Sequence, residues 1–226
     1  MHPRVVSIQV GLPRTFVGQE PWTSAILKQG APGRRWLRRE GLEGDGQADR
    51  RVHGGPDKAV LCYAAAHYPL WLAELPRPAP VFRESRVAGP EGLYGAFGEN
   101  FTIVGASEAD VCLGDIYRAG GARVQVAQPR QPCRKLTRFW GVPDLEQRVR
   151  ATGRSGWYLR VLEEGEVEPG LELILLDRAY REWTALQATQ VMNDPHHESS
   201  AALAACPPLA ESWKRQLNKR AKGTGE

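Results

Sequence analysis

Hydrophobic and polar positions alternate in several short runs along the chain, and this spacing is typical of β-strands. The clearest run covers residues 122–127, where Ala122, Val124 and Val126 are predicted to share one face of a strand. Further strands are predicted at residues 4–12, 156–162 and 171–176. The run 171–176 is so apolar that we expect it to be buried on both faces.

Helical spacing of apolar residues is confined to a few segments. Residues 65–75 show it, and residues 133–152 read as two short helices separated by Gly141 and Pro143. Long loops with short strands are predicted for the Gly- and Pro-rich stretch 13–58, and a loop for the similar stretch 76–100. Many short strands with few helices favour a mainly β fold with some α structure, built on a β-barrel core.

The chain changes character near residue 183, where β-branched residues become rarer and Ala, Leu, Gln and Lys become more frequent. Three helices are predicted beyond this point, the first capped by Thr184, the second at 198–205 and the third at 209–219. The sequence therefore predicts a β-barrel domain at 1–183 and a small three-helix domain at 184–226.

Composition narrows the class of protein. The chain has 226 residues, of which 42% are hydrophobic and 25% charged, as in globular proteins. It lacks the roughly 20 continuous apolar residues of a membrane span and the apolar core of a secretion signal, so we expect a cytoplasmic protein. The net charge of +4 suits nucleic acid, an anionic small molecule or solubility alone. Stable nucleic-acid binding is not expected, because the arginines are scattered in glycine turns without an aromatic platform.

Cys133 is the strongest candidate for chemistry. It ends a turn with two prolines, and its basic neighbours Arg130, Arg134 and Lys135 favour a thiolate. A thiolate attacks electrophiles or binds soft metals. The alternative is a small buried cysteine at the junction between a loop and a helix. The chain contains no Cys-x-x-Cys pair, so a zinc ribbon is not indicated.

Residues 49–58 form a second candidate segment. Gly54 and Gly55 allow a ligand to approach the backbone closely, and His53 can donate a hydrogen bond. Charge for a phosphate comes from Arg50, Arg51 and Lys58. The alternative is a solvated turn with surface arginines.

Two further segments combine glycine with polar residues. Gly98 and Asn100 lie in a turn before a β run, where the asparagine bonds either a ligand or its own backbone. Arg154 and Ser155 lie between glycines and are candidates for completing an anion pocket. The alternative for this last segment is an ordinary hairpin turn.

Taken together, the segments resemble the MOSC domain family, named for the C-terminal domain of molybdenum cofactor sulfurases, and within it a stand-alone YiiM-like bacterial subgroup. The resemblance covers nearly the whole chain and rests on residues 42–45, 49–58, 98–100, 128–133, 152–157 and 212–214. It implies a barrel that holds the molybdenum cofactor (molybdopterin), with Cys133 as the ligand to molybdenum. It also implies reduction of N-hydroxylated small molecules, such as hydroxylaminopurine base analogues, to amines.

The expected site follows from the segments and the resemblance together. Catalytic roles are assigned to Cys133, His53 and Asn100. The cofactor is expected to contact Arg50, Arg51, His53, Gly54, Gly55, Lys58, Gly98, Asn100, Gln128, Arg130, Cys133, Arg154 and Ser155. The sequence shows no nicotinamide or flavin fingerprint and no iron–sulfur cysteine cluster. Electrons are therefore expected from a separate flavoprotein or iron–sulfur reductase.

Two other functions share these residues. The first is a sulfur carrier, in which Cys133 holds a persulfide and passes sulfur to an acceptor. The second is a non-catalytic protein that stores or delivers the molybdenum cofactor. A self-contained sulfurase is not expected, because the chain has no room for a pyridoxal phosphate domain.

Overall fold

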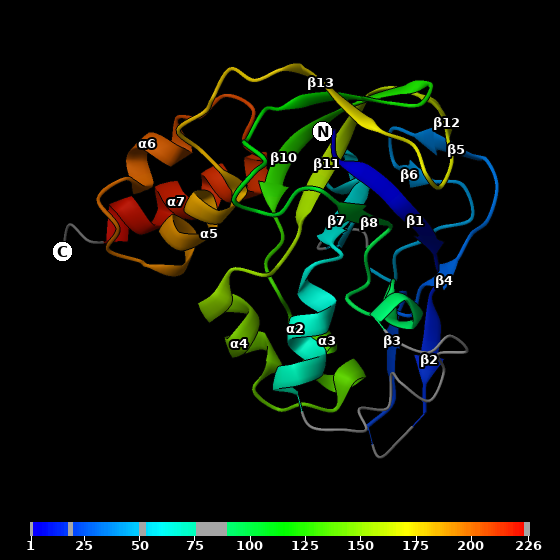
Figure 1. Cartoon of the computed structure of the whole chain (residues 1–226). Helices are drawn as coiled ribbons and strands as arrows, with labels where there is room; N and C mark the ends of the chain where they lie inside the picture. Colours follow the sequence, from blue (N-terminus) through cyan, green and yellow to red (C-terminus); the bar gives the residue numbers. More distant parts are fainter. Residues whose placement is uncertain (1, 18–19, 50–52, 76–89, 224–226) are drawn as a thin grey trace.

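The computed structural model describes residues 2–17, 20–49, 53–75 and 90–223, and its largest element is a curled sheet of eight strands (Figure 1). The strand order is β13-β9-β10-β11-β7-β8-β1-β4. The bounds are β1 Arg4–Val10, β4 Gln29–Gly30, β7 Val60–Ala64, β8 Phe101–Val104, β9 Ile116–Ala119, β10 Ala122–Pro129, β11 Trp157–Glu163 and β13 Leu173–Asp177.

The sheet curls because its two ends are tied together near the N-terminus. All neighbouring strands are antiparallel except β7 and β8, which are parallel. The backbone amide of Val5 donates to Leu171 over 2.9 Å, and that of Leu173 donates to Pro3 over 2.7 Å. These bonds bring the segment before β13 against β1, so the sheet forms a half-barrel around its core. Ala122, Val124 and Val126 all point into that core, as predicted.

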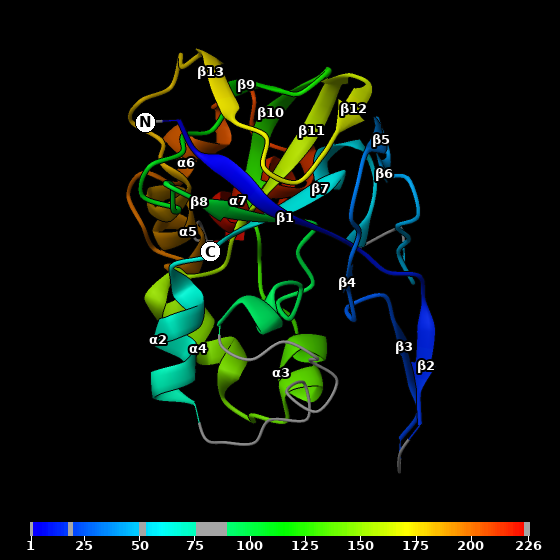
Figure 2. The same cartoon turned by 45° about the vertical axis from the view of Figure 1, so that its right-hand side comes forward.

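Two small sheets extend the half-barrel. One contains β12 (Gly165–Val167), β5 (Arg35–Arg38) and β6 (Gly41–Leu42). The other is a hairpin of β2 (Arg14–Phe16) and β3 (Trp22–Ser24), in which Phe16 stacks on Trp22 with ring centroids 4.3 Å apart. Figure 2 shows the hairpin projecting beside α3.

A layer of three helices, α2 (His67–Glu74), α3 (Arg134–Trp140) and α4 (Leu145–Thr152), packs under one end of the sheet (Figure 2). The two-helix prediction for 133–152 is confirmed. Gly141 ends α3 and Gly153 ends α4, each in the left-handed conformation. The layer has its own aromatic core, which includes Trp71, Phe97 and Trp140.

The last three helices lie on the other side of β10 (Figure 1). They are α5 (Ala185–Asn193), α6 (Ser200–Ala204) and α7 (Glu211–Gly223). Thr184 caps α5 in a capping box with Gln187, as the sequence predicted for this residue. Trp213 and Leu217 of α7 are buried in the same hydrophobic cluster as the sheet.

The mainly β fold with α structure is confirmed, and one strand prediction is wrong. Residues 171–176 were expected to be buried on both faces, but Leu175 and Leu176 are 37% and 52% exposed. The reason is position, since β13 is the terminal strand of the eight-stranded sheet and β9 is its neighbour there. None of the helices in the described ranges has the length and apolar character that crossing a bilayer requires.

Candidate functional site

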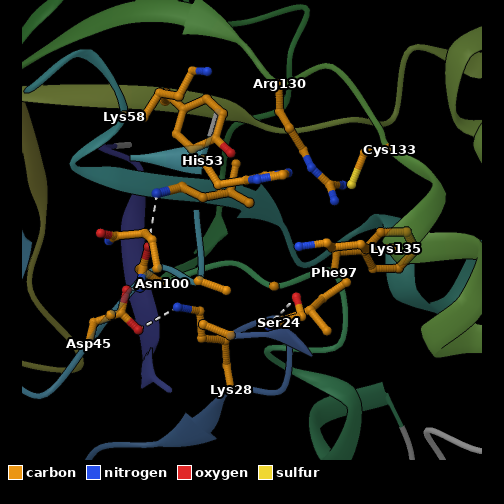
Figure 3. Close-up of a pocket in the computed structure, with 18 of the residues that line it drawn as sticks. Ser24, Lys28, Asp45, His53, Lys58, Phe97, Asn100, Arg130, Cys133 and Lys135 are labelled. Carbon is orange, nitrogen blue, oxygen red and sulfur yellow. Dashed lines mark hydrogen bonds and ion pairs between the residues drawn. The ribbon is translucent and has the colours of Figure 1, made fainter. Parts of the chain in front are cut away.

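A pocket opens where the ends of β10 and β11 meet the loops that follow β3 and β6 (Figure 3). Its empty volume is about 690 Å³, part of it open to solvent. The polar lining consists of Ser24, Lys28, Asp45, Gln47, His53, Lys58, Asn100, Arg130, Gln131, Cys133, Lys135 and Tyr158.

Cys133 stands at the junction between the turn after β10 and the first residue of α3. Its backbone is extended, with φ −133° and ψ 163°, so the chain changes direction at this residue before the helix begins. The side chain lines the pocket and is only partly exposed. Figure 3 shows the sulfur beside the guanidinium of Arg130.

The surroundings of Cys133 favour its thiolate. Burial by itself raises the pKa of the thiol, but the hydrogen bond from His53, the charge of Arg130 and the backbone amide of Lys135 outweigh burial. The net result is a pKa lowered to about 7. The other three cysteines are free and buried, and burial raises the thiol pKa of each. Cys133 is thus the cysteine suited to nucleophilic or metal-binding chemistry.

Arg130 supplies a buried positive charge beside this sulfur. Its backbone amide donates to Gly156 over 2.9 Å, which fixes the end of β10. The side chain is only 6% exposed, and its Nη1 has no hydrogen-bond partner among the described residues. A buried guanidinium with an unused N–H is costly, so the arrangement suits a pocket that receives an anionic ligand.

Opposite Cys133, the pocket floor is built on a buried ion pair between Lys28 and Asp45 (Figure 3). Burial lowers the pKa of Lys28, and the Asp45 carboxylate opposes that effect. Asp45 also accepts hydrogen bonds from the Gly11 amide over 2.7 Å and from the Asn100 side chain over 3.0 Å. The sequence did not assign Lys28 to the site, because it lies in a loop with no periodic pattern.

The structure brings six of the residues assigned from the sequence together in the pocket lining. They are His53, Lys58, Gly98, Asn100, Arg130 and Cys133. The polar atoms of Asn100 are engaged within the protein, since its carbonyl accepts from the Leu61 amide over 3.1 Å and its amide donates to Asp45 and to the backbone of Gln9. Asn100 therefore braces the pocket wall.

Five other assigned residues that the structure describes are not part of the pocket lining. Arg154 does not line the pocket, because its guanidinium donates to Glu74 over 2.8 Å and lies over the ring of Trp71. Ser155 is fully buried behind it. Gln128, Gly54 and Gly55 are also absent from the lining. Arg50 and Arg51 lie outside the residues that the structure describes.

The donor set fits one kind of metal centre. Within the described ranges, no three His, Cys, Asp or Glu side chains gather as a metal site. A metal here would take Cys133 as its protein ligand and bring its other ligands with it. The lining also carries four cationic side chains, Lys28, Lys58, Arg130 and Lys135, against one carboxylate, Asp45. Thiolate and cations together suit a soft metal held in an anionic organic cofactor.

Comparison with known proteins shows which family the chain resembles. Residues 49–173 match the model of the MOSC domain. The protein YflK of Bacillus subtilis strain 168 is 40% identical over 223 residues, which cover 96% of this chain and 93% of that protein. A reductase of Gibberella moniliformis is 38% identical over 190 residues, which are 83% of this chain and 31% of that protein. The crystal structure of YiiM from Geobacillus stearothermophilus superposes with a TM-score of 0.77 at 34% identity, covering 96% of this chain and 98% of that one.

Proposed function

Because the chain belongs to the MOSC domain family, we propose that it binds the molybdenum cofactor through Cys133 and reduces N-hydroxylated compounds to amines. The observation that carries this proposal is the thiol of Cys133, whose pKa is lowered to about 7 in a pocket lined with cations. The family is associated with the molybdenum cofactor, and a relative that covers most of this chain is named a reductase.

Residues of the pocket have distinct tasks in this proposal. The sulfur of Cys133 binds the metal, and the free Nη1 of Arg130 donates to an anionic group of the cofactor. Lys58 and Lys135 add positive charge at the same wall. The bound cofactor supplies a metal that exchanges two electrons and accepts oxygen. In this proposal Arg130, Lys58 and Lys135 bind the pterin phosphate, and Arg154 does not.

The reaction also needs protons. Reduction of R–NHOH to R–NH₂ consumes two electrons and two protons and releases one water. His53 lines the pocket next to Cys133, so its imidazole ring can donate a proton to the departing oxygen. Asn100, whose polar atoms are already bonded, holds the wall against which the substrate rests.

Electrons are assigned to a separate flavoprotein or iron–sulfur reductase. The chain has no dinucleotide-binding fingerprint and no cluster of cysteines for iron and sulfur. We place the reaction in the cytoplasm, since all four cysteines are free and a reducing compartment keeps them so. Turnover by the purified chain with NADH alone would contradict the need for a partner.

The first test measures metal and pterin in protein from a host that makes the cofactor. Wild type is expected to carry molybdenum and pterin near one per chain, and Cys133→Ala is expected to lose the metal. Cys206→Ala is the matched control, because Cys206 is also a free cysteine but does not line the pocket. Loaded wild type is then assayed for N-reduction with a chemical electron donor. Wild type without either component, even after reconstitution, would overturn the proposal.

A sulfur carrier is the second candidate, and the same lowered thiol pKa favours it. It predicts a Cys133 peptide heavier by one sulfur atom in mass spectrometry of the protein as isolated. A non-catalytic cofactor carrier predicts tight cofactor binding with no N-reduction, even when electrons are supplied. The metal analysis and the reduction assay together separate the three functions.

A further inference from the structure

Helix α7 contacts the segment that presents Cys133. This segment, called the Cys133 turn below, comprises residues 127–133, which are the end of β10 and the turn that follows it. The hydroxyl of Ser212 donates to the side chain of Gln128 over 3.2 Å. The side chain of Gln131 donates to that of Gln216 over 3.3 Å. Ser212 and Gln216 are four positions apart, so they project from the same side of the helix. Gln131 itself lines the pocket.

Hydrogen bonds to backbone carbonyls, one from the residue before α7 and one from an α4 side chain, hold both ends of the turn. Just before α7, the amide of Ala210 donates to the carbonyl of Ala127 over 3.0 Å. At the other end, Arg150 of α4 donates to the carbonyl of Pro132 over 3.2 Å. The backbone of Arg150 accepts in turn from Asn193, the last residue of α5, over 3.0 Å.

Two of the seven residues of the turn lack a backbone donor, so contacts from outside the turn add to its support. Pro129 and Pro132 have no N–H, so they cannot donate to a neighbouring strand or turn. Helix α7 is a firm support, since Trp213 and Leu217 are buried in the main core on an adjacent side of the helix. A rigid helix thus adds side-chain contacts to a turn that β11 already holds through the bond from the Arg130 amide to Gly156.

We propose that α7 positions the Cys133 turn, with Ser212 and Gln216 acting through Gln128 and Gln131. The three C-terminal helices are in this account a support for the pocket wall. Ser212 and Gln216 are positioning residues, because neither lines the pocket. The proposal goes beyond the proposed function and holds for any chemistry at Cys133. It is tested on the full chain without cofactor, so its failure is distinct from failure of the proposed reaction.

The test is hydrogen–deuterium exchange of the full chain, read on peptides that cover residues 128–136. Gln216→Leu combined with Ser212→Ala is expected to speed exchange of these amides by roughly threefold or more, since a segment with fewer bonds opens more often. Gln216→Glu, made with native Ser212, keeps an acceptor for Gln131. The amides of the turn are expected to exchange as slowly in this variant as in wild type. Asn218→Leu is the control, because Asn218 is exposed on another side of α7.

A double-mutant cycle tests the pairing directly. Gln131→Leu and Gln216→Leu are expected to produce similar increases, and the double variant no larger one, if the two side chains act through each other. Melting temperatures identify any variant that loosens the whole protein. The proposal would be overturned if the turn exchanges at the wild-type rate in Gln216→Leu/Ser212→Ala. It would also be overturned if the turn exchanges faster than wild type in Gln216→Glu.

Discussion

The imidazole of His53 hydrogen-bonds the sulfur of Cys133, although the two residues come from segments far apart in the sequence. Together with the charge of Arg130, this bond lowers the thiol pKa to about 7, which favours the thiolate at neutral pH compared with an ordinary cysteine. His53→Ala removes the bond and is expected to move the pKa toward the ordinary value of 9.0. Alkylation of Cys133 at pH 7 should slow several-fold and recover above pH 9.

This first prediction is measured by iodoacetamide labelling across pH, with the Cys133 peptide quantified by mass spectrometry. His196→Ala is the control, since His196 is exposed and does not line the pocket. An unchanged labelling profile in His53→Ala would remove His53 from the account of the thiolate.

Arg130→Met separates stability from ligand binding. Because Arg130 Nη1 is buried without a partner in the described structure, replacing the side chain by an apolar one is expected to raise the stability of the empty protein by about 1 kcal/mol. The gain should appear at pH 6, below the thiol pKa, where the charge of Arg130 has little thiolate to stabilise. Cofactor loading should fall sharply in the same variant. Calorimetry and pterin content measure the two effects, and a destabilised empty protein at pH 6 contradicts the prediction.

Asp45→Ala is expected to destabilise the chain by roughly 3–5 kcal/mol, because it leaves a buried lysine charge without a partner. The same substitution removes the acceptor for Gly11 and for Asn100. Chemical denaturation measures the loss. Adding Lys28→Met should recover part of it, because the uncompensated charge is then gone. A double variant that is less stable than Asp45→Ala would show that Lys28 is not held by this pair alone.

Gly156→Ala should cost roughly 3 kcal/mol or more of stability, because a methyl group at this position meets the carbonyl of Cys62 and φ is +81°. Gly170→Ala is the matched control. Its φ is +93°, but nothing lies within 4 Å of the added methyl, so only backbone strain of about 1–2 kcal/mol is expected. Equal losses in the two variants would show that the close approach to Cys62 has no energetic weight.

Much of the fold could be predicted from the sequence because its signals are local. Alternation gave β10, and Gly141 with Pro143 separated α3 from α4. The exposure of Leu175 could not be predicted, because the composition of a strand does not reveal that it ends a sheet. That fact depends on pairing with residues far away in sequence.

The candidate site, like the fold, could be predicted from the sequence only where the signal is local. Arg130 and Cys133 share one turn, so their proximity follows from their spacing. Lys28 was not predicted, because its place in the pocket depends on the ion pair with Asp45, and local sequence does not reveal this contact. Arg154 was placed in the pocket from its glycine neighbours, but Glu74 of α2 and the ring of Trp71 hold it outside. Local composition cannot foresee such competition for a flexible cation.

The place of β7 in the sheet sets the order in which the chain can fold during synthesis. Every residue of β7 is buried, and its two neighbours are β8 and β11. A ribosome that has just finished β8 still has to make β11, which ends at Glu163. Until then one edge of an apolar strand lacks its partner, and such edges invite aggregation. A nascent chain stalled before Glu163 is therefore expected to expose this edge, because folding waits for contacts between residues far apart in sequence.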